Sequence, residues 1–168
     1  TGATAAPVTF GVLVAGGGNT IGGPADSDMN VIVASAVGVQ VTDGDGNTVS
    51  RNHIGVDASG ATVIAPAAGF GVLIAGGGTS NARDTTVSAN IISGHSRNVV
   101  VIGSGTDRTR VTDNLIGAVA AGGRAAVENV RFDGSPQPTV SANTITGATG
   151  TDLVIAGRVE AVVVPLQA

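Results

Sequence analysis

The chain has 168 residues, of which 27 are glycine, 2% are aromatic and 12% are charged, and its formal net charge is −4. So few aromatic residues argue against a conventional two-layer core, and the negative charge argues against a nucleic-acid partner, which needs a clustered basic face. Because the chain has no cysteine, disulfides and thiolate metal sites are excluded. No apolar run of about 18 residues is present, so no membrane span is predicted, and no signal peptide is recognised.

After a lead-in at residues 1–10, a short strand pattern recurs along the whole chain. In it, apolar residues alternate with other residues, which is the period of a strand with one buried face. These first strands begin at residues 11, 38, 71, 98, 129 and 152, so they are 23 to 33 residues apart. The corresponding predicted coils are 11–37, 38–70, 71–97, 98–128, 129–151 and 152–168.

A second pattern, V-x-x-N-x-I, follows four of the first strands and predicts two further strands with a bend between them. It occurs as Val49/Asn52/Ile54, Val87/Asn90/Ile92, Val111/Asn114/Ile116 and Val140/Asn143/Ile145. In the first coil its two halves are pulled apart, at residues 19–21 and 30–32. A constant motif with variable spacing predicts a solenoid whose loops differ in length.

The period of two also predicts which side chains of the first strands form the core. The residues expected to point inward are Val39, Val41, Val72, Ile74, Val99, Val101, Val130, Phe132, Leu153 and Ile155. The residues expected in an outward column are Leu13, Gln40, Leu73, Val100, Arg131 and Val154. Four of those six are apolar, so the column is predicted to be covered by the lead-in, by the tail or by a partner chain.

The asparagines of the motif are predicted to stack above one another, each amide donating to the next, as in cross-β stacks. Asparagine suits the bend because it tolerates the left-handed conformation and its amide can bond to neighbouring groups. The ladder would consist of Asn30, Asn52, Asn90, Asn114 and Asn143. The alternative is that these five polar groups line a binding groove.

Residues 19–23, N-T-I-G-G, and residues 52–61, N-H-I-G-V-D-A-S-G-A, resemble secreted bacterial arrays of the right-handed parallel β-helix class. The resemblance implies an all-β fold, a single-stranded right-handed parallel β-helix of about six coils with three short strands each. It covers one domain, 1–168, with coils over 11–158 and a terminal cap over 159–168. It also implies an extracellular or cell-surface location. Pectate lyases, polygalacturonases and adhesins resemble the same architecture, so the fold does not select a function.

One turn offers a candidate metal site. Asp43, Asp45 and Asn47 present oxygens at alternate positions, the spacing by which loops bind Ca²⁺. No bidentate glutamate follows at the distance that an EF-hand needs, so the motif is partial. A hydrated turn without metal is the other interpretation.

Charged residues of the third and fourth coils form a candidate catalytic ledge: Arg83, Asp84, Asp107, Arg108, Arg110 and Asp113. Stacked coils would bring these side chains to one edge. A hydrolase needs two or three carboxylates at fixed separation, whereas this cluster alternates in sign, which favours mutual ion pairing. His53, expected to point outward from a third strand, and His95, in a turn, each lack the Ser or Cys partner of a nucleophilic site.

The sequence therefore predicts a non-catalytic structural or adhesive module of a larger bacterial surface or secreted protein. The predicted partners are neighbouring domains of a longer chain or a surface polysaccharide. The first alternative is a polysaccharide-binding or polysaccharide-degrading domain that uses the ledge, although no Trp or Tyr is available as a sugar platform. The second is weak self-association through the unpaired strands at the ends of the solenoid.

Overall fold

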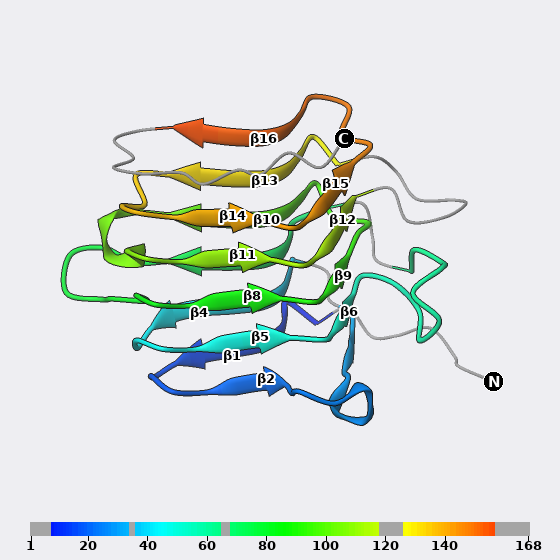
Figure 1. Cartoon of the computed structure of the whole chain (residues 1–168), viewed down its shortest axis with the longest axis horizontal. Coiled ribbons are helices and arrows are strands. Elements are labelled where there is room, and N and C mark those ends of the chain that lie inside the picture. The colour runs from blue at the N-terminus through cyan, green and yellow to red at the C-terminus, as the bar shows by residue number, and fades with distance from the viewer. Residues whose placement is uncertain (1–7, 34–35, 65–67, 118–125, 157–168) are drawn as a thin grey trace.

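The computed structural model describes residues 8–33, 36–64, 68–117 and 126–156. Over these residues the protein is all-β, and its chain winds through three parallel sheets as a right-handed parallel β-helix (Figure 1). Five coils each give one strand to every sheet, and a sixth coil adds a strand to the largest sheet. The predicted fold class is confirmed. The predicted cap, 159–168, and residues 1–7 of the lead-in lie outside the described residues.

Three sheets, A, B and C, hold the first, second and third strands of the coils. Sheet A contains β1 (Phe10–Ala15), β4 (Val37–Asp43), β7 (Phe70–Ala75), β10 (Arg97–Ile102), β13 (Glu128–Asp133) and β16 (Thr151–Ala156). Sheet B contains β2 (Thr20–Gly22), β5 (Thr48–Ser50), β8 (Thr86–Ser88), β11 (Arg110–Thr112) and β14 (Thr139–Ser141). Sheet C contains β3 (Val31–Ile32), β6 (His53–Ile54), β9 (Ile91–Ile92), β12 (Leu115–Gly117) and β15 (Thr144–Thr146). Two short 3₁₀ turns, Asp26–Asp28 and Ser104–Thr106, lie in the connections.

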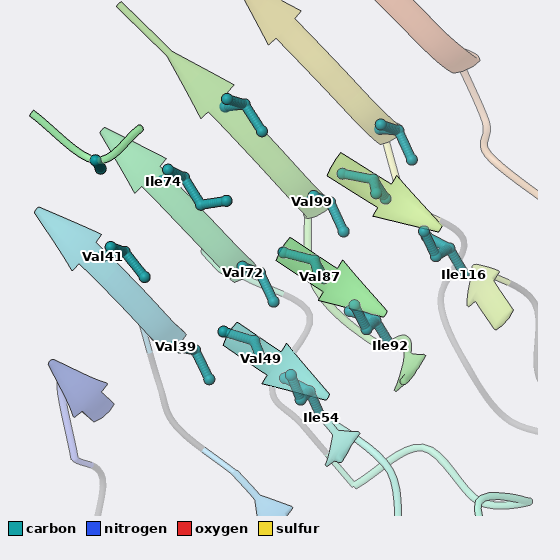
Figure 2. Close-up of a cluster of buried hydrophobic side chains, with 14 of the residues drawn as sticks. Val39, Val41, Val49, Ile54, Val72, Ile74, Val87, Ile92, Val99 and Ile116 are labelled. Carbon is teal, nitrogen blue, oxygen red and sulfur yellow. The ribbon is translucent and has the colours of Figure 1, made fainter. Parts of the chain in front are cut away.

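The core is a set of columns of branched aliphatic side chains. Each three-residue strand of sheet B points its middle residue inward, and Val49, Val87 and Val111 stack in register there. Ile54 and Ile92 pair in the same way in sheet C. Figure 2 shows these side chains meeting the inward valines and isoleucines of sheet A between the sheets. Small branched residues fill this narrow interior at close packing, so the chain needs few aromatic residues.

The predicted inward set is confirmed for every member except Ile155. Eight of them, from Val39 to Phe132, are fully buried. Leu153 is partly buried against the core, and Ile155, in register with Phe132, is 40% exposed. Both residues belong to β16, and in the described part of the chain no coil stacks beyond that strand.

The predicted outward column is also in register along sheet A, but its surface is not a continuous stripe. Leu13 pairs with Gln40, and Leu73 pairs with Val100. Leu13 is 55% exposed, whereas Val100 is only 4% exposed. Val100 lies between the longer side chains of Leu73 and Arg131 in its column. The apolar stripe is therefore interrupted at its centre.

At the bend between sheets B and C, the residue in the left-handed conformation is not the asparagine, as the sequence predicted, but the residue before it. Arg51, Ala89, Asp113 and Ala142 have φ values of 54°, 55°, 58° and 54°. The physical reason is that the asparagine side chain must point along the stack to reach the next coil. The preceding residue therefore makes the bend, and its own side chain is left outside.

Candidate functional site

The predicted asparagine ladder is confirmed, and it runs through five coils. Asn52 Nδ2 donates to Asn90 Oδ1 at 3.1 Å, and Asn90 Nδ2 donates to Asn114 Oδ1 at 3.0 Å. Asn30 and Asn143 extend the ladder at its two ends through bonds of 3.0 and 2.9 Å. Each acceptor oxygen also receives the backbone N–H of the preceding ladder residue. These amides are used within the stack, so they do not line a groove.

Two shorter polar columns lie at the other corners, and sequence analysis missed both. Asn19 Nδ2 donates to Asn47 Oδ1 at 3.1 Å at the corner between sheets A and B. Asn98 Nδ2 donates to Asn129 Oδ1 at 2.7 Å at the start of sheet A, and Asn129 Nδ2 donates to Asp152 Oδ1 at 2.5 Å. The available signal was a recurring polar residue near the start of a strand. Asn19 and Asn47 stand directly before β2 and β5, and the second residues of β10, β13 and β16 are Asn98, Asn129 and Asp152.

The oxygens of the predicted calcium site contact the protein. Asp43 Oδ1 accepts the backbone N–H of Asn81 at 3.0 Å, and Asp45 Oδ1 accepts that of Arg83 at 3.0 Å. Asn47 is fully buried, and its Oδ1 accepts from Asn19 rather than facing the two carboxylates. Among the described residues, no group of three or more His, Asp or Glu side chains is arranged as a metal site. The carboxylates join neighbouring coils in this geometry, and calcium binding stays a prediction.

The structure divides the predicted ledge. Arg108 makes a forked ion pair with Asp84, at 2.8 and 2.6 Å, and also bonds to Asp107. Arg108 lowers the pKa of the Asp84 carboxyl, chiefly through this hydrogen bond, and Asp84 in turn raises the pKa of the Arg108 guanidinium. Both partners are more than a third exposed, so the pair contributes little to stability in water.

The other members of the ledge do not join this ion pair. Arg83 contributes its backbone N–H to Asp45. Arg110 begins β11, whereas Asp113 lies just after that strand, at the bend towards sheet C. The strand separates these two residues by about 10 Å along its axis. The six residues therefore comprise an ion-paired group of three, Arg108, Asp84 and Asp107, and three residues outside it. Of these three, Arg83 and Arg110 are close enough to Asp84 for their charges to lower the pKa of its carboxyl, whereas Asp113 is separated from them by β11.

The two histidines have different surroundings. His53 lies in β6 with its side chain half-buried, and its Nδ1 is 3.0 Å from the Asp57 carbonyl oxygen. His95 is only 1% exposed, and burial lowers its pKa to about 4. Within the described structure neither ring nitrogen of His95 has a hydrogen-bond partner, and neither does Asn98 Oδ1. The sequence placed His95 correctly in a turn but carried no sign of its burial.

Part of the segment that carries the bacterial β-helix resemblance forms a self-contained turn. Asp57 Oδ1 accepts from the Ser59 hydroxyl at 2.7 Å and from the backbone N–H groups of Ala61 and Thr62 at 3.2 Å. These hydrogen bonds, led by that of Ser59, lower the pKa of Asp57 to about 2. The carboxylate is therefore occupied in ordering its own loop.

The outer face of sheet B carries two in-register rows composed mainly of threonine and serine, which sequence analysis also missed. One row contains Thr20, Thr48, Thr86, Arg110 and Thr139, and the other contains Gly22, Ser50, Ser88, Thr112 and Ser141. The tripeptide T-V-S, present at residues 48–50, 86–88 and 139–141, was the available signal. The central valine of this tripeptide was assigned to the core, but the outward-facing hydroxyls on either side of it were not considered.

A groove of about 460 Å³ lies across this face and the adjoining bend. Its polar lining includes Thr20, Thr48, Ser50, Ser88, Arg51 and Asp113. Arg51 Nη1 bonds to Asp26 Oδ1 at 2.9 Å, so the cation at the groove has an anionic neighbour. The volume of the groove and its mixture of donors and acceptors are compatible with a bound ligand.

No family model, curated protein or solved structure matches this chain. The class of protein is therefore defined by its architecture, the parallel β-helix, and by the sites described above. None of the helical segments that the structure describes has the length and apolar character to cross a membrane.

Proposed function

We propose that the chain is a non-catalytic structural and adhesive module of a larger bacterial surface or secreted protein. The observation that carries this proposal is the asparagine ladder, which connects five coils through side-chain amides at 2.9 to 3.1 Å. Neighbouring coils are thus tied by side chains as well as by strand pairing, and such a stack resists bending. A stiff rod suits a spacer that holds other domains or loops at a fixed distance.

The arrangement of the charged groups also supports a non-catalytic role. General acid–base chemistry needs a carboxyl group that is free to exchange a proton near neutral pH. Asp84 is instead held by Arg108 with its pKa lowered, and Asp107 bonds to the same guanidinium. These two aspartates are the anionic partners of Arg108 in a surface ion pair.

Stiffness is tested by attaching a fluorescent donor and acceptor to two cysteines, which can be introduced uniquely because the chain has none. D26C and S141C lie in the first and fifth coils. We expect one narrow distance distribution that does not change between low and high salt. A broad or salt-dependent distribution would remove the spacer role.

Catalysis is tested separately by incubating the protein with pectin, alginate and β-glucan and measuring new reducing ends and unsaturated uronates. We expect neither product. Product formation that D84N/D107N abolishes would establish the enzymatic alternative and overturn the proposal.

A further inference from the structure

We infer that the groove on sheet B binds an uncharged, hydroxyl-rich polymer, that is, a neutral polysaccharide chain lying across β2, β5 and β8. This inference rests on the adhesive part of the proposed function and names its partner. It does not depend on the spacer role.

The side chains that line the groove offer hydrogen bonds that the protein leaves largely unused. In the described part of the chain, Ser50 donates to the Gly23 carbonyl oxygen at 3.4 Å, whereas the hydroxyls of Thr48 and Ser88 donate to no protein group. A hydroxyl both donates and accepts, so a row of hydroxyls complements a ligand that also carries hydroxyls. An apolar partner would desolvate these groups without replacing their hydrogen bonds.

The charges around the groove favour a neutral ligand. Arg51 and Asp113, which both line the groove, have opposite signs, and Arg51 is already paired with Asp26. The whole chain has a net charge of −4, which opposes the approach of a polyanion. A nucleic acid or a polyuronate would find no excess of positive charge here.

The rows are also periodic and rigid. Thr48 and Thr86 are direct neighbours in register, and so are Ser50 and Ser88. Successive coils are about 4.8 Å apart, so the same group recurs along the rod at a constant interval. The valines beneath the rows, Val49 and Val87, are fully buried and hold the strands in place. A repeating polymer can therefore contact several coils without reorganising the protein, which lowers the cost of binding.

The test titrates the whole chain with cellohexaose, laminarihexaose and maltohexaose, which are neutral, and with hexagalacturonate, which is anionic. Binding is followed by amide chemical shifts. We expect at least one neutral hexasaccharide to bind and to shift amides of β5 and β8, with weaker binding of the uronate. The absence of binding by all three neutral sugars at millimolar concentration, or stronger binding of the uronate, overturns the inference.

Two double variants locate the site. T48V/S88A removes two hydroxyls from the groove, whereas T139V/S141A makes the matched change in the same rows but outside the groove lining. Loss of two neutral hydrogen bonds is expected to weaken binding about tenfold in T48V/S88A and by less than about twofold in T139V/S141A. Equal affinities of the two variants overturn the assignment of the groove. Both variants must keep the unfolding temperature of the parent chain, because their changes lie on the outer face.

Comparison of the titration of the unmodified chain with the separate distance measurement distinguishes this inference from the proposed function, and sedimentation distinguishes it from self-association. If no sugar binds but the donor–acceptor distance distribution is narrow and independent of salt, the sugar-binding inference is refuted and the spacer role is retained. Sedimentation that shows a dimer dissolved by T48V/S88A identifies the face as a contact between two copies and overturns the inference.

Discussion

Replacement of Asn114 by alanine tests the ladder at an interior position, where the side chain bonds to both neighbouring coils. Asn114 is 2% exposed, and its Oδ1 accepts from both the backbone N–H and the Nδ2 of Asn90, at 2.9 and 3.0 Å. Its own Nδ2 donates to Asn143 Oδ1 and to the carbonyl oxygens of Val87 and Thr112, each at 2.9 Å. The side chain therefore joins three coils.

The magnitude follows from the groups that the substitution leaves without a partner. Asn90 Nδ2 still has the carbonyl oxygens of Val49 and Ser88, but the Asn90 backbone N–H has no other described acceptor. A buried donor left unsatisfied costs about 1–3 kcal/mol, and the lost amide packing adds to this. We expect N114A to lower the free energy of unfolding by about 3 kcal/mol.

Asn30 provides the matched control. It is exposed in the first coil, and in the described structure no ladder residue donates to its Oδ1. N30A removes one bond to Asn52 Oδ1, which keeps the Asn30 backbone N–H as a donor at 3.3 Å. The expected cost is below about 1 kcal/mol.

Urea unfolding measures both variants, and amide hydrogen exchange follows the Asn90 N–H directly. This amide should be protected in the parent chain and in N30A, and should exchange faster in N114A. If N114A were no less stable than N30A and the Asn90 amide kept its protection, the ladder would not contribute as the geometry implies.

Three further predictions concern other parts of the stack. Burial lowers the pKa of His95 from 6.5 to about 4, so the unfolded chain takes up a proton at a higher pH than the folded chain does. The free energy of unfolding should therefore be constant above pH 6.5 and should fall by about 3 kcal/mol as the pH is lowered to 4. H95N should abolish this loss, and H53Q should retain it. G38A places a Cβ 2.5 Å from the Gly71 carbonyl oxygen and 2.6 Å from Ile54 Cγ2, so it should destabilise the fold by about 1–3 kcal/mol in thermal unfolding. The control is G77A, whose Cβ meets nothing within 4 Å and which should change stability little. Equal effects of the two variants would contradict the close packing at Gly38. R108A should lower the urea midpoint only slightly, and the difference from the parent chain should shrink at high salt because exposed charges are screened; a large loss that does not depend on salt would contradict the weak contribution expected of this exposed ion pair.

The sequence by itself determined the fold and the ladder, because both depend on patterns that repeat within each coil. Val49 and Ile54 lie at fixed offsets from Asn52, and the same offsets recur at Asn90 and Asn114. Parallel strands in register place equivalent residues above one another, so one coil specifies its neighbour. The strand columns and the stacked amides could therefore be predicted from local spacing alone.

The tertiary structure alone decided how the corners and the outer faces combine. The left-handed residue at the bend is the one before the asparagine, because the amide must point along the stack. The six-residue ledge is divided, because β11 separates Arg110 from Asp113. The groove depends on how the 23–30 connection and the bend at Arg51 approach sheet B, and His95 becomes buried in its turn. These features depend on contacts between connections of unequal length, and no pattern that repeats in each coil specifies the distances between the residues involved.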